Sequence, residues 1–129
     1  GHQTTFNAKP VWARACAELG SAWLYATSPH MFSGADFAGF ERLRKAARRA
    51  VYGAECYAYG LLANGTVDLV AEADMKPYDY AALVPVVNGA GGVITDWRGG
   101  ALDLESDGTV LAAGDARMHK AALAALAGP

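Results

Sequence analysis

The stretch from Thr66 to Asp96, TVDLVAEADMKPYDYAALVPVVNGAGGVITD, decides the fold. Its first part, Thr66 to Ala71, alternates between polar and apolar residues as a strand does, and so predicts a strand. Asp79 to Val87 opens with an acidic residue and predicts a helix, which the glycines of Asn88 to Gly92 end. A further strand is expected at Val93 to Asp96. A strand, a helix and a strand in succession are typical of a layered α/β domain.

Pro85 lies inside the predicted helix. It should remove one backbone hydrogen bond and kink the helix, unless it lies in the first turn, where its missing N–H does no harm.

The rest of the chain continues the alternation of strands and helices. Strands are expected at Trp23 to Thr27 and Thr109 to Ala113, and helices at Asp36 to Arg49, Ala54 to Ala63 and Ala116 to Ala127. Gly1 to Pro10 resembles a polar hairpin. We therefore predict one α/β domain over residues 1–129, with a mixed or largely parallel central sheet flanked by helices.

Size and charge limit the classes of function. With 129 residues and 53% hydrophobic content, the chain can bury one compact core. Its formal charge of -2 and its 19% of charged residues give no basic surface for nucleic acid or for an anionic membrane. Neither a membrane-spanning run nor a signal-peptide pattern is found, so we expect a soluble cytoplasmic protein without nucleic-acid or membrane partners.

Cysteine and histidine spacing gives no metal site. Cys16 and Cys56 lie far apart with no CxxC motif, and we expect both to be reduced and mostly buried. None of the histidines has a ligand spacing, and surface or hairpin positions are expected for all of them: His2, His30 and His119.

A basic cluster lies toward the C-terminal end of the helix predicted at Asp36 to Arg49. It could bind phosphate, but a solvated helix face is the simpler interpretation. Its members are Arg42, Arg44, Lys45, Arg48 and Arg49.

Acidic residues follow the strand that begins at Thr66. Glu72 and Asp74 come directly after it, and Asp79 begins the next helix. Ligands of open α/β sheets bind beyond the carboxyl ends of the strands, and carboxylate oxygens suit Mg²⁺. The residues by themselves favour an ordinary N-cap for Asp79 over metal binding.

Two motifs carry a resemblance to a known family. Tyr78 to Ala82, an aromatic-Asp-x-Ala-Ala pattern, is followed by a Gly-Gly turn and strand at Gly89 to Asp96. Together they resemble the second signature of the inositol monophosphatase family. The resemblance implies that Asp79 is a metal-binding carboxylate that also approaches the substrate, and that Glu72 contacts a substrate hydroxyl or amine.

The resemblance also implies a substrate wall at Gly53, Ala54 and Glu55. Three stretches are similar in sequence to the histidinol-phosphatase branch: Glu55 to Tyr59, Lys76 to Asp79 and Thr27 to Phe32. That branch generally carries Asp at the position of Glu55. A carboxylate there could pair with the cationic amine of histidinol phosphate.

The resemblance covers the C-terminal half of the family fold. The family's other half supplies a glutamate and an Asp-Pro-x-Asp-Gly-Thr type loop, and nothing like that loop occurs here. The N-terminal metal-binding domain is therefore expected to be a missing partner. The implied activity is Mg²⁺-dependent hydrolysis of a small phosphomonoester by a longer protein, with the isolated chain silent because Asp79 is its single metal ligand.

Three alternatives to histidinol-phosphatase activity remain open. Inositol monophosphate could be the substrate, the chain could be a non-catalytic binding or assembly domain, or it could belong to a bisphosphate phosphatase, which needs further cationic contacts.

We also expect a homodimer of the full-length protein. Packing or an interdomain face is expected for Trp12, Trp23 and Trp97, with an exposed apolar patch that favours self-association.

Overall fold

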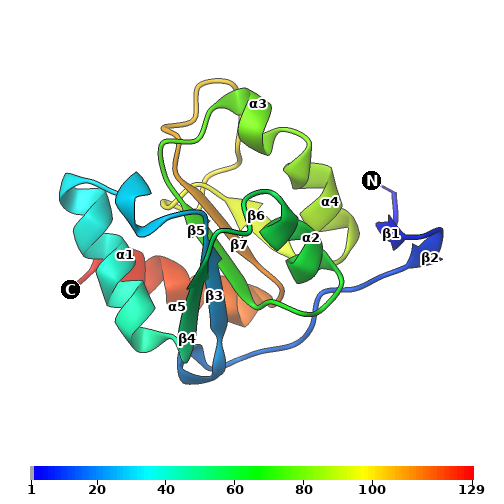
Figure 1. Ribbon diagram of the computed structural model, residues 1–129, viewed down its shortest axis with the longest axis horizontal. Coiled ribbons are helices and arrows are strands. Elements are labelled where there is room, and N and C mark those ends of the chain that lie inside the picture. The colour runs from blue at the N-terminus through cyan, green and yellow to red at the C-terminus, as the bar shows by residue number, and fades with distance from the viewer. Residues whose placement is uncertain (1) are drawn as a thin grey trace.

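A mixed five-stranded sheet forms the centre of the molecule (Figure 1). The computed structural model describes residues 2–129. The strand order is β4-β3-β5-β7-β6, with β3 parallel to β4 and β5, and β7 antiparallel to β5 and β6. The predicted α/β class with a mixed sheet is confirmed. The strands are β3 (Trp23–Ala26), β4 (Arg49–Tyr52), β5 (Leu69–Glu72), β6 (Val93–Thr95) and β7 (Val110–Ala113).

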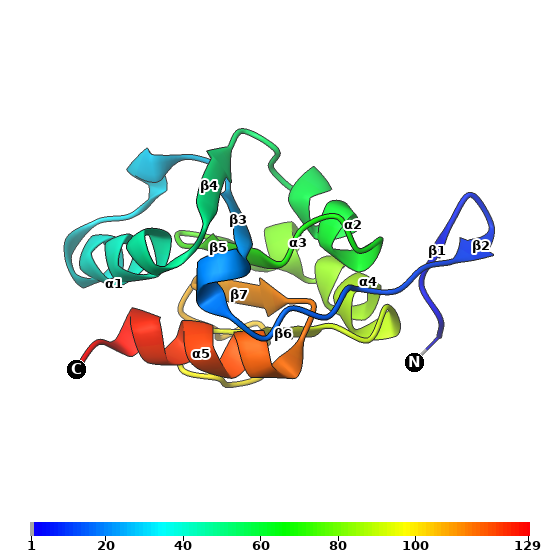
Figure 2. The ribbon, with the colours of Figure 1, turned by 90° about the horizontal axis from the view of Figure 1, so that it is seen from below.

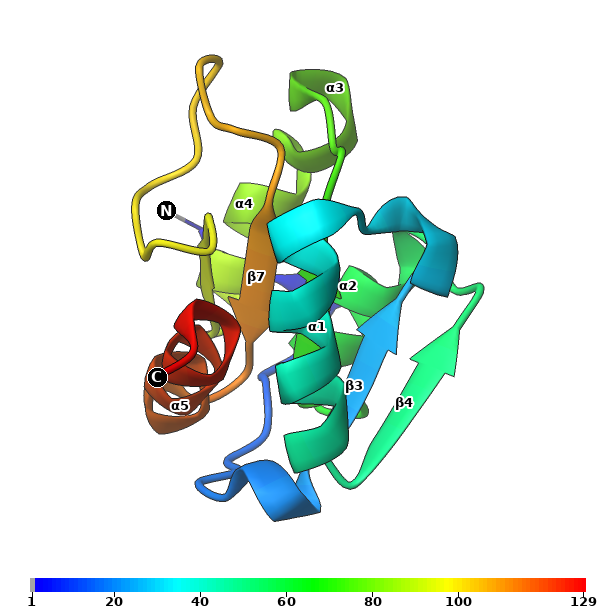
Figure 3. The ribbon, with the colours of Figure 1, turned by 90° about the vertical axis from the view of Figure 1, so that its left-hand side faces the viewer.

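Helices cover both faces of the sheet, as Figures 1 and 3 show. One face carries the two longest helices, α1 (Gly34–Ala46) and α5 (Ala116–Ala127). The other carries α2 (Tyr57–Ala63), α3 (Pro77–Tyr80) and α4 (Leu83–Gly89). Two short 3-10 turns, η1 (Leu19–Ser21) and η2 (Pro29–Met31), flank β3.

The central strands have buried side chains on both faces. Every residue of β5 and β7 is buried, and successive residues pack into opposite cores. Leu69 and Ala71 face α1 and α5, whereas Val70 faces α2. Burial on both faces explains why these segments are almost continuously apolar.

The helix predicted from Asp36 ends earlier than expected. It stops at Ala46, because Arg49–Tyr52 pairs with β3 as a parallel edge strand that the sequence pattern did not reveal. The Arg49 guanidinium lies 5.1 Å from the Trp23 ring centroid. Tertiary pairing thus overrides a helical pattern.

The basic cluster around this helix is not one site. Arg42 donates from Nε to the Ala125 carbonyl (2.9 Å) and from Nη2 to the Leu126 carbonyl (2.6 Å) in the last turn of α5. Arg44 is paired with Glu41 at 2.7 Å. Because these cations stabilise different parts of the fold, the cluster gives no support to a phosphate site.

The single helix predicted at Asp79 to Val87 is wrong, because two helices occupy this segment. Asp79 is the third residue of α3, which begins with Pro77, and α4 begins only at Leu83. Pro85 is the third residue of α4, so its missing N–H lies in the first turn and costs no hydrogen bond.

The N-terminal segment forms the expected hairpin, β1 (Thr5–Phe6) with β2 (Lys9–Pro10), which extends from the body of the molecule (Figure 2). Thr4 attaches it to the end of α4. Its N–H donates to the Gly89 carbonyl (3.0 Å) and its hydroxyl to the Val86 carbonyl (2.6 Å). A Cβ on Gly89 would lie 2.5 Å from the His2 carbonyl oxygen, so this contact requires glycine.

Two side-chain placements differ from expectation. His119 is 8% exposed rather than on the surface, since α5 packs it against β6, where its Nε2 lies 2.8 Å from Thr95 Oγ1. Cys56 is exposed rather than buried, and Cys16 is half-buried. Trp12 is 61% exposed, while Trp97 packs on the ring of Phe32.

Across residues 2–129, the helices are all too short or too polar to cross a membrane.

Candidate functional site

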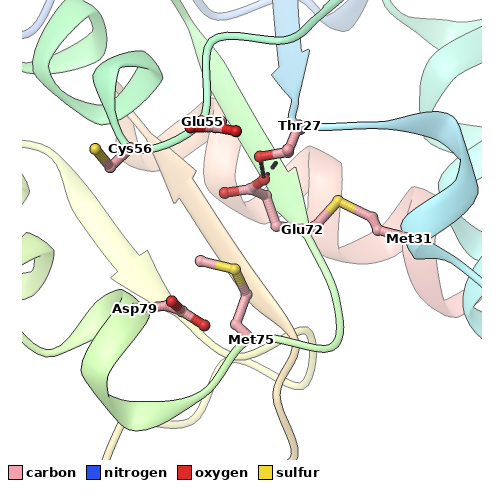
Figure 4. Close-up of a pocket in the computed structure, with 7 residues that line it drawn as sticks. All are labelled: Thr27, Met31, Glu55, Cys56, Glu72, Met75 and Asp79. Carbon is pink, nitrogen blue, oxygen red and sulfur yellow. Dashed lines mark hydrogen bonds between the residues drawn. The ribbon is translucent and has the colours of Figure 1, made fainter.

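A cavity of about 400 Å³ opens where β3 and β5 end (Figure 4). Thr27 directly follows β3 and Glu72 is the last residue of β5, so the parallel strands bring both to one edge of the sheet. This is the edge at which open α/β sheets bind ligands. The residues that line the cavity are Thr27, Met31, Glu55, Cys56, Glu72, Met75 and Asp79.

Glu72 is buried at the base of the cavity, with 1% of its surface exposed. Its Oε2 accepts hydrogen bonds from the Thr27 N–H (3.0 Å) and from the Thr27 hydroxyl. Its Oε1 accepts a hydrogen bond of 2.7 Å from the hydroxyl of Tyr59. Three donors from two elements therefore fix the orientation of this carboxylate.

Tyr59 lies under the cavity on α2 and is fully buried. Burial raises the pKa of its phenol well above the ordinary value, and the negative charge of Glu72 raises it further. The hydroxyl therefore keeps its proton at neutral pH and stays a donor to Glu72.

The loop after β4 forms a second wall. The Gly53 N–H donates to the Thr27 carbonyl (2.9 Å), and Gly53 has a φ of +94° that favours glycine. Glu55 also has a positive φ, +51°, which for a non-glycine residue stores backbone strain. Of the three residues predicted for this wall, Glu55 lines the cavity, while Gly53 and Ala54 shape the loop.

Asp79 faces the cavity from α3, across from Glu72 (Figure 4). Its Oδ2 accepts a hydrogen bond from the N–H of Lys76 (2.8 Å), the residue before the first turn of the helix. Asp79 is thus a capping residue at the third helical position rather than the N-cap. Its exposed side chain retains Oδ1 for an additional partner.

The structure brings together Glu55, Glu72 and Asp79 at the cavity, whereas Asp74, which follows the same strand as Glu72, lies outside it. Asp74 has a φ of +56° and lines a neighbouring cavity, with its carboxylate 3.4 Å from the Lys76 ammonium. Within residues 2–129, no three Asp, Glu, His or Cys side chains form a group that could hold a metal ion unaided.

The electrostatics of the cavity are one-sided. Its described lining has three carboxylates and no lysine, arginine or histidine. Glu72 has no ion-pair partner within 4.0 Å among the described residues, although buried charges in proteins are normally paired. The cavity is therefore suited to a cation.

Sequence reasoning missed Thr27, Tyr59, Met31 and Met75 as site residues. Both Thr27 and Tyr59 lie in the stretches that resemble the histidinol-phosphatase branch. The available signal was that Thr27 follows a strand end and that Tyr59 lies on the apolar face of a helix. The two methionines come from separate connections, η2 and the loop before α3, which no local pattern relates.

A mixed α/β sheet with an acidic cavity at the carboxyl ends of its strands is the arrangement in which α/β domains commonly bind small polar ligands. The chain belongs to the inositol monophosphatase family, whose model matches residues 2–128.

The relatives are phosphatases by name. The bifunctional phosphatase IMPL2, chloroplastic, of Arabidopsis thaliana is 45% identical over 98% of this chain. A histidinol-phosphatase of Chlorobaculum parvum is 28% identical over 87% of the chain. A solved inositol monophosphatase structure from Zymomonas mobilis, 42% identical, superposes with a TM-score of 0.95 over 98% of this chain.

The match is partial on the side of the relatives. The chain spans 38% of the Arabidopsis phosphatase, 44% of the Chlorobaculum protein and 50% of the Zymomonas chain. It therefore corresponds to about half of a typical relative.

Proposed function

We propose that this chain is the substrate-binding half of a Mg²⁺-dependent phosphomonoesterase that hydrolyses histidinol phosphate. Membership of the inositol monophosphatase family supports phosphatase activity. The observation that carries the choice of substrate is the buried carboxylate of Glu72, which has hydrogen-bond donors but no cationic partner among residues 2–129. A substrate with a cationic amine would supply that partner.

Glu55 strengthens the preference for a cation. It is exposed at the rim of the cavity that Glu72 closes at its base, and Figure 4 shows both carboxylates facing the same space. An uncharged polyol would leave two carboxylates without a counter-charge. An amine held between them would gain from both.

The donor set fits one contact to a magnesium ion. Mg²⁺ prefers oxygen ligands and is commonly held by one or two carboxylates together with phosphate and water. Asp79 offers an exposed carboxylate oxygen at the cavity. Because the described residues that line the cavity include no lysine, arginine or histidine, a phosphate group would be repelled unless metal charge neutralises it.

Each of the three acidic residues at the cavity has its own part in the proposed function. Glu55 and Glu72 bind and orient the organic part of the substrate, and Asp79 holds one metal ion near the phosphate. Magnesium would supply positive charge to the phosphoryl oxygens and activate water for attack on phosphorus. One carboxylate is too few for this metal chemistry, so we propose that residues 1–129 alone are inactive and need an N-terminal metal-binding domain.

Inositol monophosphate is the alternative substrate, supported by the likeness to the inositol monophosphatase of Zymomonas mobilis. A non-catalytic binding domain is a second alternative, supported by the absence of a complete metal group from the described residues. A homodimer of the longer protein and a cytoplasmic location also belong to the proposal. The Arabidopsis relative is named chloroplastic, so location has to be tested for this protein itself.

The test measures phosphate release by this chain joined to whatever sequence precedes it in its reading frame. With Mg²⁺, we expect a kcat/KM for histidinol phosphate at least about tenfold above that for inositol 1-phosphate, the effect of one charge-assisted contact. Glu55→Gln should reduce this preference, and Asp79→Asn should raise the Mg²⁺ concentration needed for half-maximal rate. Equal rates on both substrates would reject the substrate assignment.

The inactivity of the isolated chain has its own measurement. Residues 1–129, purified from cells that lack any full-length enzyme, should release no phosphate above the rate of the Asp79→Asn variant. Magnesium-dependent turnover by the isolated chain would show that the N-terminal domain is dispensable.

A further inference from the structure

The hydrogen bonds around Glu72 limit how a ligand can contact it. An ionised carboxylate has two oxygens and about four positions that accept hydrogen bonds. Thr27 occupies both positions of Oε2, one with its backbone N–H and one with its hydroxyl. The Tyr59 hydroxyl occupies one position of Oε1.

Within the part of the chain that the structure describes, a single acceptor position is therefore left without a donor, on Oε1. Figure 4 shows the Glu72 oxygen that is not bonded to Thr27 pointing away from Thr27, into the space between Glu55 and Asp79. The Tyr59 hydroxyl reaches the same oxygen from the buried side, since Tyr59 is fully buried on α2. The remaining position is thus directed to the cavity.

We propose that Thr27 and Tyr59 are specificity-determining residues that restrict Glu72 to a single hydrogen bond with its ligand. The site then accepts an ammonium, an imidazolium N–H or one hydroxyl. It discriminates against groups that need both carboxylate oxygens, such as a guanidinium or a vicinal diol.

The basis of this selectivity is geometric. A guanidinium binds a carboxylate best through two parallel N–H···O bonds, one to each oxygen. At Glu72 the second bond would have to displace the Thr27 hydroxyl or its N–H from Oε2. An ammonium binds as a compact charge and needs one oxygen.

The restriction is stable at neutral pH. Burial holds the pKa of Tyr59 well above its ordinary value, so its hydroxyl remains a donor. Thr27 is itself fixed, because its carbonyl accepts the Gly53 N–H (2.9 Å). Thr27 therefore connects Glu72 at the base of the cavity to the loop that carries Glu55.

This inference rests on the proposed cation-binding role of Glu72 but not on phosphatase activity. The test uses residues 1–129 and two matched probes that carry no phosphate, n-butylammonium and n-butylguanidinium. Their dissociation constants are measured from the amide NMR shifts of Glu55, Glu72 and Asp79. We expect the ammonium to bind about tenfold more tightly, the effect of losing one charge-assisted hydrogen bond.

Three variants make the result specific. The double variant Thr27→Val with Tyr59→Phe frees one position on each oxygen, and the ratio of the two dissociation constants should fall toward 1 or invert. Thr27→Ser keeps the hydroxyl and should keep the wild-type ratio. Glu72→Gln removes the charge and should weaken both probes.

The ratio separates a specific role from general loosening, because a damaged cavity would weaken both probes alike. A ratio that is the same in wild type and in the double variant would overturn the proposal. So would probes that bind wild type and Glu72→Gln equally, or not at all. Phosphate release from histidinol phosphate is tested separately, so either idea can fail while the other stands.

Discussion

The guanidinium of Arg14 donates two parallel hydrogen bonds to the carboxylate of Asp68, with Nε 2.7 Å from Oδ1 and Nη2 2.8 Å from Oδ2. Asp68 is 2% exposed and also accepts the Trp23 N–H at 2.8 Å. One buried side chain thus joins the N-terminal connection, the start of β3 and the approach to β5. The arrangement lies at the opposite end of β5 from Glu72.

Replacing Asp68 should cost stability without touching the cavity. Asp68→Asn removes the charge that pairs with Arg14 and leaves a buried donor facing the Trp23 N–H. We expect the free energy of unfolding to fall by about 2 to 4 kcal/mol, as for a broken buried pair with one exposed partner. Urea denaturation measures it, with exposed Asp74→Asn as a control that should change little.

Acid should act through the same residue. Burial raises the pKa of Asp68, but hydrogen bonds from Arg14 and the Trp23 N–H outweigh burial and hold the pKa below its ordinary value of 3.8. A lowered pKa gives stability that is complete above pH 3.8 and is lost as the pH falls through the folded-state pKa. Urea midpoints below pH 4 should therefore fall less steeply in Asp68→Asn than in wild type.

His119 should add a pH dependence in a separate window. Burial lowers its pKa below 6.5, so the folded protein binds fewer protons than the unfolded chain just below that pH. The stability that this residue gives is present above pH 6.5 and is lost as the pH falls through the folded-state pKa. His119→Gln keeps a donor for Thr95 and should flatten the stability curve below pH 6.5. A curve of unchanged slope would contradict the burial argument.

Two helical glycines should respond in opposite directions to alanine. In α1, a Cβ on Gly39 would lie 2.8 Å from the Leu126 carbonyl oxygen, so α1 and α5 could not pack as closely. In α2, a Cβ on Gly60 would point into open space, with no described atom beyond the adjacent residues and the helix's own backbone within 4 Å. We expect Gly39→Ala to lower the free energy of unfolding by about 1 to 3 kcal/mol and Gly60→Ala to raise it by up to about 1 kcal/mol. Thermal unfolding of both variants is the measurement.

The left-handed backbone at Asp74 should be relieved by glycine. Its φ is +56° and its side chain is 79% exposed, so little besides the backbone is affected. Asp74→Gly should stabilise the fold by about 0.5 to 1 kcal/mol, whereas Asp74→Ala should not. A loss of stability in the glycine variant would mean that the weak contact with Lys76 outweighs the strain.

Much of the fold was predictable because local patterns agree with the tertiary structure. The closing helix Ala116–Ala127 matches its prediction, and the buried strands were visible as apolar runs. Where local and tertiary preferences conflict, the prediction was wrong. Arg49 was predicted as the last residue of a basic helix, yet pairing with β3 makes it the first residue of the strand Arg49–Tyr52.

The site was partly predictable for a similar reason. Glu55, Glu72 and Asp79 stand next to predicted element ends, so their meeting at one edge of the sheet could be expected. Asp74 could not be separated from them by sequence, because a single positive φ turns it to a neighbouring cavity. The donors Thr27 and Tyr59 were beyond local reasoning, since Thr27 and Glu72 are 45 residues apart.

The attachment of Thr4 to α4 also has a consequence for the order of folding. The hydrogen bond from the Thr4 hydroxyl to the Val86 carbonyl closes a loop of 82 residues, and long loops carry an entropic cost that must be met before the contact forms. We expect the sheet and its helices to assemble first and the hairpin to dock afterwards. Although the hairpin is synthesised before the sheet, it would then be among the last segments of the domain to take its place.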